Sequence, residues 1–217
     1  MRSSVLARLA LPLLLAAPAV VLAHPGHEHA VSDGLGASLA AGLMHPLTGL
    51  DHICAMVVLG VWSAMTTRRI WLVPLSFALV LLAGALLGLS GVQLPAVEPM
   101  IAVSLLALGL LTATHARLPE GVGAALAGGF ALFHGVAHGA ELPPGAVAAA
   151  YVGGFMIATV LLHCLGIAGG LALRRFERHA QAASPGASPS GVAMPRAWPA
   201  RLLGSGVALY GIALLAG

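Results

Sequence analysis

The chain has 217 residues, of which 59% are hydrophobic and only 8% are charged. A soluble domain carries about 25% charged residues, so the composition excludes an ordinary soluble domain. The formal net charge is +3, but the arginines are spread between apolar stretches rather than gathered in a patch, so nucleic-acid binding is not indicated.

The first 23 residues have the three parts of a secretory signal peptide. Arg2 and Arg8 form a basic start, residues 9–22 form an apolar core, and Val-Leu-Ala ending at Ala23 is a small-residue cleavage site. We expect cleavage after Ala23. An uncleaved first transmembrane helix is the alternative.

Residues 24–33 then form a tail outside the membrane that is rich in histidine. Three of its first six residues are His24, His27 and His29. Short histidine-rich tracts commonly bind metal ions. We therefore expect this periplasmic tail to act as an outer capture arm.

The rest of the chain, residues 34–217, reads as a membrane domain. A helix needs about 20 mainly apolar residues to cross a bilayer. The apolar runs are too long and unbroken for the alternating pattern of a β-barrel. The candidate spans are residues 34–66, 70–90, 97–115, 121–141, 145–174 and 201–217. The sequence predicts an all-α integral membrane protein with about six transmembrane helices.

The arginines orient these spans. With the mature N-terminus outside, the inner loops are residues 66–70, 115–121 and 174–201, and they hold every arginine beyond the signal. The outer loops, residues 90–97 and 141–145, have none. This is the positive-inside pattern. Within the last inner segment, residues 176–200 are predicted to be a flexible cytoplasmic linker, since Ala, Ser, Pro and Gly dominate it from residue 180.

The first span carries a polar string with a proline in it. Proline is disfavoured inside a helix, so His45 followed by Pro46 predicts a break there and a fresh helix over residues 47–66. A broken helix at membrane depth is a device by which transporters coordinate cations. Asp51 and His52 follow in the fresh helix, and Met56 lies one turn beyond His52.

The fourth span carries the second polar string. It contains His134, followed four positions later by His138 and seven positions later by Glu141, so the three side chains share one face of a helix. Gly135 and Gly139 leave room beside this face for another helix or a ligand.

The topology places the two strings at similar depth, because the first span enters from outside while the fourth runs outward. Ionisable side chains at membrane depth are costly unless they pair or bind something. Imidazoles and carboxylates without a nearby arginine indicate a transition-metal cation as the partner. The predicted main site comprises His45, Asp51, His52, His134, His138 and Glu141, and Met56 and His163 extend it along a path.

Both strings resemble the signatures of a known family. Residues 45–52 (His-Pro-Leu-Thr-Gly-Leu-Asp-His) are similar to the first signature of the HupE/UreJ nickel permeases, and residues 130–141 (Phe-Ala-Leu-Phe-His-Gly-Val-Ala-His-Gly-Ala-Glu) to the second. The resemblance covers essentially the whole mature chain. It implies secondary import of nickel, or of cobalt, across the bacterial inner membrane, supplying hydrogenase or urease maturation. It also implies that the histidines and carboxylates of both strings are the metal site.

The expected protein is thus a permease rather than an enzyme, with Ni²⁺ or Co²⁺ as substrate and no prosthetic group. The chain has no lysine and therefore no Gly-x-x-x-x-Gly-Lys-Ser/Thr loop, which excludes ATP-driven pumping by this chain alone. The rival hypothesis is an intramembrane zinc-dependent hydrolase using His134 and His138. Cys54 and Cys164 are expected to be buried free thiols; a disulfide or a soft metal ligand is the alternative. A homo-oligomer is left open.

Overall fold

The structure of the protein is a computed structural model that describes residues 34–182 and 198–217. The predicted signal peptide (residues 1–23) and nearly all of the histidine-rich tail (24–33) lie outside the described residues, and both stay predictions. The described part contains helices and no strand, as expected for an all-α protein. The helices are α2 (Leu35–Thr48), α3 (Leu50–Thr66), α4 (Leu72–Leu89), α5 (Val97–Thr114), α6 (Glu120–Ala140), α7 (Ala148–Ala182) and α8 (Trp198–Ala216).

Five of these helices, α4 to α8, are long and apolar enough to cross a membrane, and α2 with α3 forms a sixth candidate as one bent pair. Each matches one of the predicted runs, so the six-helix prediction is confirmed at the level of length and composition. The predicted linker (176–200) is wrong at both ends. Helix α7 continues to Ala182 and α8 begins at Trp198; residues 183–197 lie outside the described part.

The first span is broken, but three residues later than predicted. Pro46 lies inside α2, and the chain leaves helical geometry at Gly49, which is extended (φ −91°, ψ 113°). Because Pro46 falls in the last turn of α2, its missing N–H removes only one hydrogen bond of a helix that is about to end. Helix α3 starts at Leu50 and is bent from α2 by 77°.

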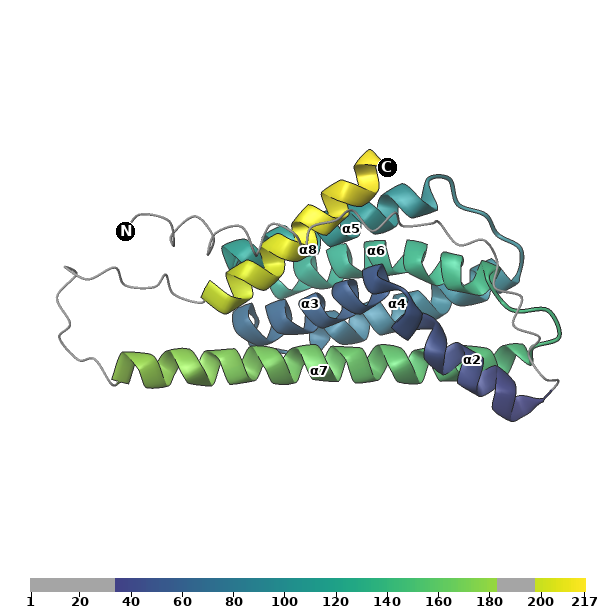
Figure 1. Cartoon of the computed structure of the whole chain (residues 1–217), viewed down its shortest axis with the longest axis horizontal. Helices are drawn as coiled ribbons and strands as arrows, with labels where there is room; N and C mark the ends of the chain where they lie inside the picture. Colours follow the sequence, from purple (N-terminus) through teal and green to yellow (C-terminus); the bar gives the residue numbers. More distant parts are fainter. Residues whose placement is uncertain (1–33, 183–197) are drawn as a thin grey trace, which may run out of the picture. The chain divides into compact units, whose positions relative to one another are not determined.

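The two halves of this broken segment run in the same direction along α7 (Figure 1). The residues that contact each other follow the same sequence order in the two segments: Ser38 with Val147, Gly42 with Tyr151, Val57 with Gly166, and Ala64 with Arg174. A re-entrant loop would reverse direction between α2 and α3. The order of contacts therefore favours one broken span that runs parallel to α7.

Two further helix pairs are formed through glycines, which let helix backbones approach closely. A Cβ on Gly84 or Gly88 of α4 would meet the backbone of α6, and the two helices run parallel. Gly109 of α5 likewise meets Gly204 of α8, in an antiparallel pair. These directions agree with six spans that alternate along the chain. The α4–α5 and α6–α7 connections accordingly share one end, and the arginine-bearing connections share the other.

Apolar side chains serve both the interior and the outer surface of the described helices. Trp62, Phe77 and Phe155 are fully buried between helices. Large apolar side chains also stay exposed on the outward faces, among them Leu79, Leu161, Leu165 and Leu209. Water would not tolerate so much exposed apolar surface, whereas lipid tails would. The chain is a multi-pass membrane protein.

Candidate metal centre

Helix α6 presents two buried histidines from one face. His134 and His138 are both fully buried. The glycine that follows each of them, Gly135 and Gly139, packs against the backbone of α4, where a Cβ would collide with Leu81 and Ala85. Successive residues on a helix point about 100° apart, so pressing the glycines against α4 turns the imidazoles toward the bundle interior. The room that Gly135 and Gly139 leave is filled by a helix.

The break between α2 and α3 shapes the other half of the site. The His52 Nδ1–H donates to Asp51 Oδ1 at 2.9 Å, and this pair folds back over Gly49. A Cβ at position 49 would lie 2.7 Å from both of these atoms, so only glycine leaves room for the pair. Asp51 lies in the first turn of α3, where the helix dipole favours a carboxylate.

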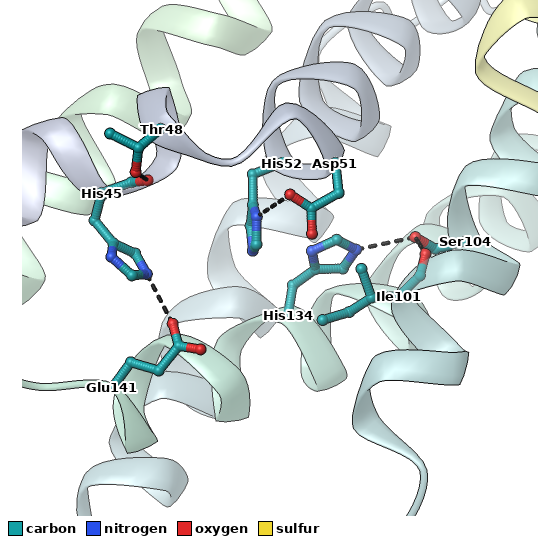
Figure 2. Close-up of polar contacts among 8 residues, drawn as sticks. All are labelled: His45, Thr48, Asp51, His52, Ile101, Ser104, His134 and Glu141. Carbon is teal, nitrogen blue, oxygen red and sulfur yellow. Dashed lines mark hydrogen bonds and ion pairs between the residues drawn. The ribbon is translucent and has the colours of Figure 1, made fainter. Parts of the chain in front are cut away.

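The two predicted strings meet in space, which confirms the expectation of equal depth. The ring of His138 lies 4.8 Å from that of His45 and 4.4 Å from that of His52, measured between centroids. The rings of His52 and His134 are 5.2 Å apart. Four imidazoles from α2, α3 and α6 thus form one cluster, which we call the histidine cluster (Figure 2 labels three of them, His45, His52 and His134).

The outer part of the histidine cluster includes a carboxylate. His45 Nε2 lies 2.9 Å from Glu141 Oε2. Ligand atoms of His45, His138 and Glu141 all lie within 4.8 Å of one another, a compact group that can hold a metal ion. The side chains of His45 and Glu141 are 28% and 57% exposed while His138 is fully buried. The group therefore leads from the surface into the protein.

Several nitrogens of the cluster have no partner among the described residues. They are His52 Nε2, His134 Nδ1 and both ring nitrogens of His138, all buried. A buried polar atom without a hydrogen bond is unfavourable by about 1–3 kcal/mol. Since each neutral imidazole offers one lone pair, His52, His134 and His138 can each present one ligand atom to a cation.

Three residues that contact the cluster were not predicted from the sequence. Ser104 of α5 lies 2.9 Å from His134 Nε2 (Figure 2). Phe155 stacks on His138 at 5.2 Å, and Tyr151 lies 5.8 Å from His45, both between ring centroids. A serine or an aromatic residue in an apolar run carries no signal of its own, so only the packing of α5 and α7 reveals these contacts.

The two residues proposed for the path lie elsewhere. His163 of α7 is nearly fully buried, and the ring of Phe77 contacts both His163 and His134, with centroid distances of 5.3 and 5.7 Å. Met56 is fully buried in the hydrophobic core. Neither belongs to the histidine cluster. Cys54 and Cys164 are free thiols, as expected, but both are half-buried rather than buried.

The fold and this cluster define a class: a multi-pass helical membrane protein with a buried histidine and carboxylate centre. The family model described as HupE / UreJ protein matches residues 11–214. Protein HupE of Rhizobium leguminosarum bv. viciae is 44% identical over 204 residues, which cover 94% of each chain. The chain belongs to the HupE/UreJ family. No solved structure matches it.

Proposed function

We propose that this protein is a permease that carries nickel ions, with cobalt as the alternative substrate, through the histidine cluster. The observation that supports this most directly is the set of buried, unpartnered imidazole nitrogens beside two carboxylates. The arginines of the described residues lie in or beside the connections at the end of the spans opposite to the histidine cluster. The carboxylates of Glu141 and Asp51 are paired with His45 and His52, and in our proposal a divalent cation binds among these imidazoles and carboxylates.

The ligand chemistry supports a passing ion rather than a trapped one. Imidazole and carboxylate suit divalent nickel and cobalt, while magnesium and calcium prefer all-oxygen shells. Both cysteines are outside the histidine cluster, so no thiolate cage would retain the metal. Conduction requires sites that replace the hydration shell yet release the ion afterwards, and a mixed histidine and carboxylate site meets both needs.

Exposure suggests the order in which an ion meets these groups. Glu141 and His45 are the most exposed and would bind first. His138, fully buried and within 4.8 Å of His45 by ring centroid, comes next. His52, whose side chain is 12% exposed, contacts the rings of both His138 and the fully buried His134, so ring contacts rather than exposure place these two histidines last in the proposed order. His163, beyond Phe77, is the next histidine along α7 and is proposed as a later station.

The family and the charge pattern support a cellular setting for the proposed transport. Positive-inside arginines place the mature N-terminus in the periplasm if the protein resides in the bacterial inner membrane. The resemblance to nickel permeases links the imported ion to hydrogenase or urease maturation. No feature of the described helices favours the zinc hydrolase over transport.

The test is metal uptake by the purified full chain in proteoliposomes. We expect Ni²⁺ or Co²⁺ to enter faster than into protein-free vesicles, and Mg²⁺ not to. The variant His138→Ala, inserted at equal density, is the matched control and should lose most of the uptake. Running each metal with and without a pH gradient separates passive from proton-coupled entry. Equal uptake by the wild type, His138→Ala and empty vesicles would contradict the proposal.

A further inference from the structure

The histidine cluster is contacted by Ser104 of α5, which is not one of the proposed metal ligands. Ser104 is fully buried, and its Oγ lies 2.6 Å from the Ile101 carbonyl oxygen and 2.9 Å from His134 Nε2 (Figure 2). A serine hydroxyl has one proton to donate and two lone pairs that accept. The two contacts therefore compete for a single proton.

The shorter contact decides where that proton goes. Two oxygens at 2.6 Å need a proton between them, and a carbonyl oxygen cannot supply one. The Ser104 hydroxyl therefore donates to Ile101. Its remaining lone pair can only accept, so His134 must carry its ring proton on Nε2 and donate it to Ser104.

This hydrogen bond determines the state of the other ring nitrogen. A neutral imidazole that is protonated on Nε2 has its lone pair on Nδ1. His134 Nδ1 is buried and has no partner among the described residues. In Figure 2 the ring of His134 lies between Ser104 on one side and the Asp51–His52 pair on the other. The lone pair is thus held on the side of the ring away from Ser104, which is the cluster side.

We propose that Ser104 is a positioning residue: it selects the tautomer and ring orientation of His134 that present Nδ1 as a metal ligand. Groups that hold the second nitrogen of a ligating histidine typically change metal affinity 10- to 100-fold when they are removed. The proposal rests on the proposed function for the identity of the ion, but the tautomer can be measured without any transport.

Three substitutions test it in the full-length protein. Ser104→Ala removes the acceptor, and Ser104→Thr keeps a hydroxyl that can bond the same helix carbonyl. Thr112→Ala is the matched control, because the buried Thr112 hydroxyl donates to the Leu108 carbonyl in the same helix and Thr112 is not part of the histidine cluster. We expect Ser104→Ala to raise the half-saturating nickel concentration about tenfold. Ser104→Thr and Thr112→Ala should stay near the wild type.

A second measurement reads the tautomer directly. Nitrogen NMR of the metal-free wild type, with histidine labelled and the signal assigned by its loss in His134→Asn, should show a protonated Nε2 and an unprotonated Nδ1 in His134. A proton on Nδ1 instead would overturn the proposal, even if Ser104→Ala failed to fold. Unchanged nickel affinity in Ser104→Ala, or equal losses in Ser104→Ala, Ser104→Thr and Thr112→Ala, would also overturn it. Absence of uptake by the wild type, with the expected tautomer and Ser104-dependent nickel binding, would refute only the transport function.

Discussion

The histidine cluster is built by two segments that place their side chains by different means. On α6, His134 and His138 are held by the regular turn of one unbroken helix whose glycine face packs on α4. In the other segment, His45 belongs to α2 while Asp51 and His52 belong to α3, on either side of a 77° bend. The positions of His134 and His138 are therefore set by regular helix geometry and by the packing of α6 on α4.

The broken half depends on a single non-helical residue. Gly49 is extended and lies under the Asp51–His52 hydrogen bond, with no room for a Cβ. A change of backbone geometry at this point would move His45 relative to His52. On α6 the unbroken helix fixes the position of His134 relative to His138. The comparison teaches that one half of the cluster is positioned by a regular helix packed through glycines, and the other by a single non-helical residue.

The largest expected effect comes from removing one ligand from each half. His52→Ala and His138→Ala should each reduce nickel uptake by more than the 10- to 100-fold typical of outer partners, because each removes a lone pair from the cluster itself. The double variant should be little worse than either single variant, as for residues that act as a unit. The measurement is the initial uptake rate into proteoliposomes at equal protein density. Near-normal rates in both single variants would show that the two halves do not form one site.

Acid should affect both halves together, since both present imidazoles. An imidazole must be neutral to bind metal, so protons compete with the ion for the same lone pair as the pH falls past the ordinary imidazole pKa of about 6.5. Carboxylates protonate near pH 4 and stay charged over this range. Uptake at limiting nickel should decline from pH 7 to pH 5, and more nickel should partly restore it. The check is initial rate against external pH at several nickel concentrations without a proton gradient. A rate that climbs on acidification would indicate proton-coupled import instead.

Gly49→Ala tests the special role of the break. The added methyl group would lie 2.7 Å from Asp51 Oδ1 and His52 Nδ1, so the pair must shift, and we expect about a tenfold loss of nickel affinity. Gly129→Ala on α6 is the control, because a Cβ there meets nothing within 4 Å and alanine suits a helix better than glycine. Binding isotherms of the purified variants give the comparison. Equal affinities in the two variants would mean that the break does not position the pair.

The smallest effect is expected from the predicted tail. Changing His24, His27 and His29 together to alanine should lower uptake mainly at limiting nickel, because an arm that concentrates ions is not part of the path. The rate at saturating nickel should stay near that of the wild type. Uptake measured over a range of nickel concentrations distinguishes the two regimes. Loss of the rate at saturation would place the tail in the conduction pathway.

Much of this architecture can be predicted from neighbouring residues in the sequence. The six spans follow from the length of the apolar runs, and the orientation expected for them follows from the arginines. The α6 stripe of His134 and His138 follows from helical periodicity, and a break in the first span, though not its position, was predicted from the proline within it. Each of these depends on near neighbours along the chain, so the sequence alone could determine it.

Other features were decided only by the three-dimensional structure. The break falls at Gly49 rather than at Pro46, and the structure shows the Asp51 and His52 side chains in the space that a Cβ at position 49 would take. Ser104 joins the site only because α5 packs beside α6, 30 positions away along the chain. An isolated serine or glycine in an apolar helix carries no periodic signal. Its role is set by what the tertiary structure brings within hydrogen-bonding or van der Waals distance.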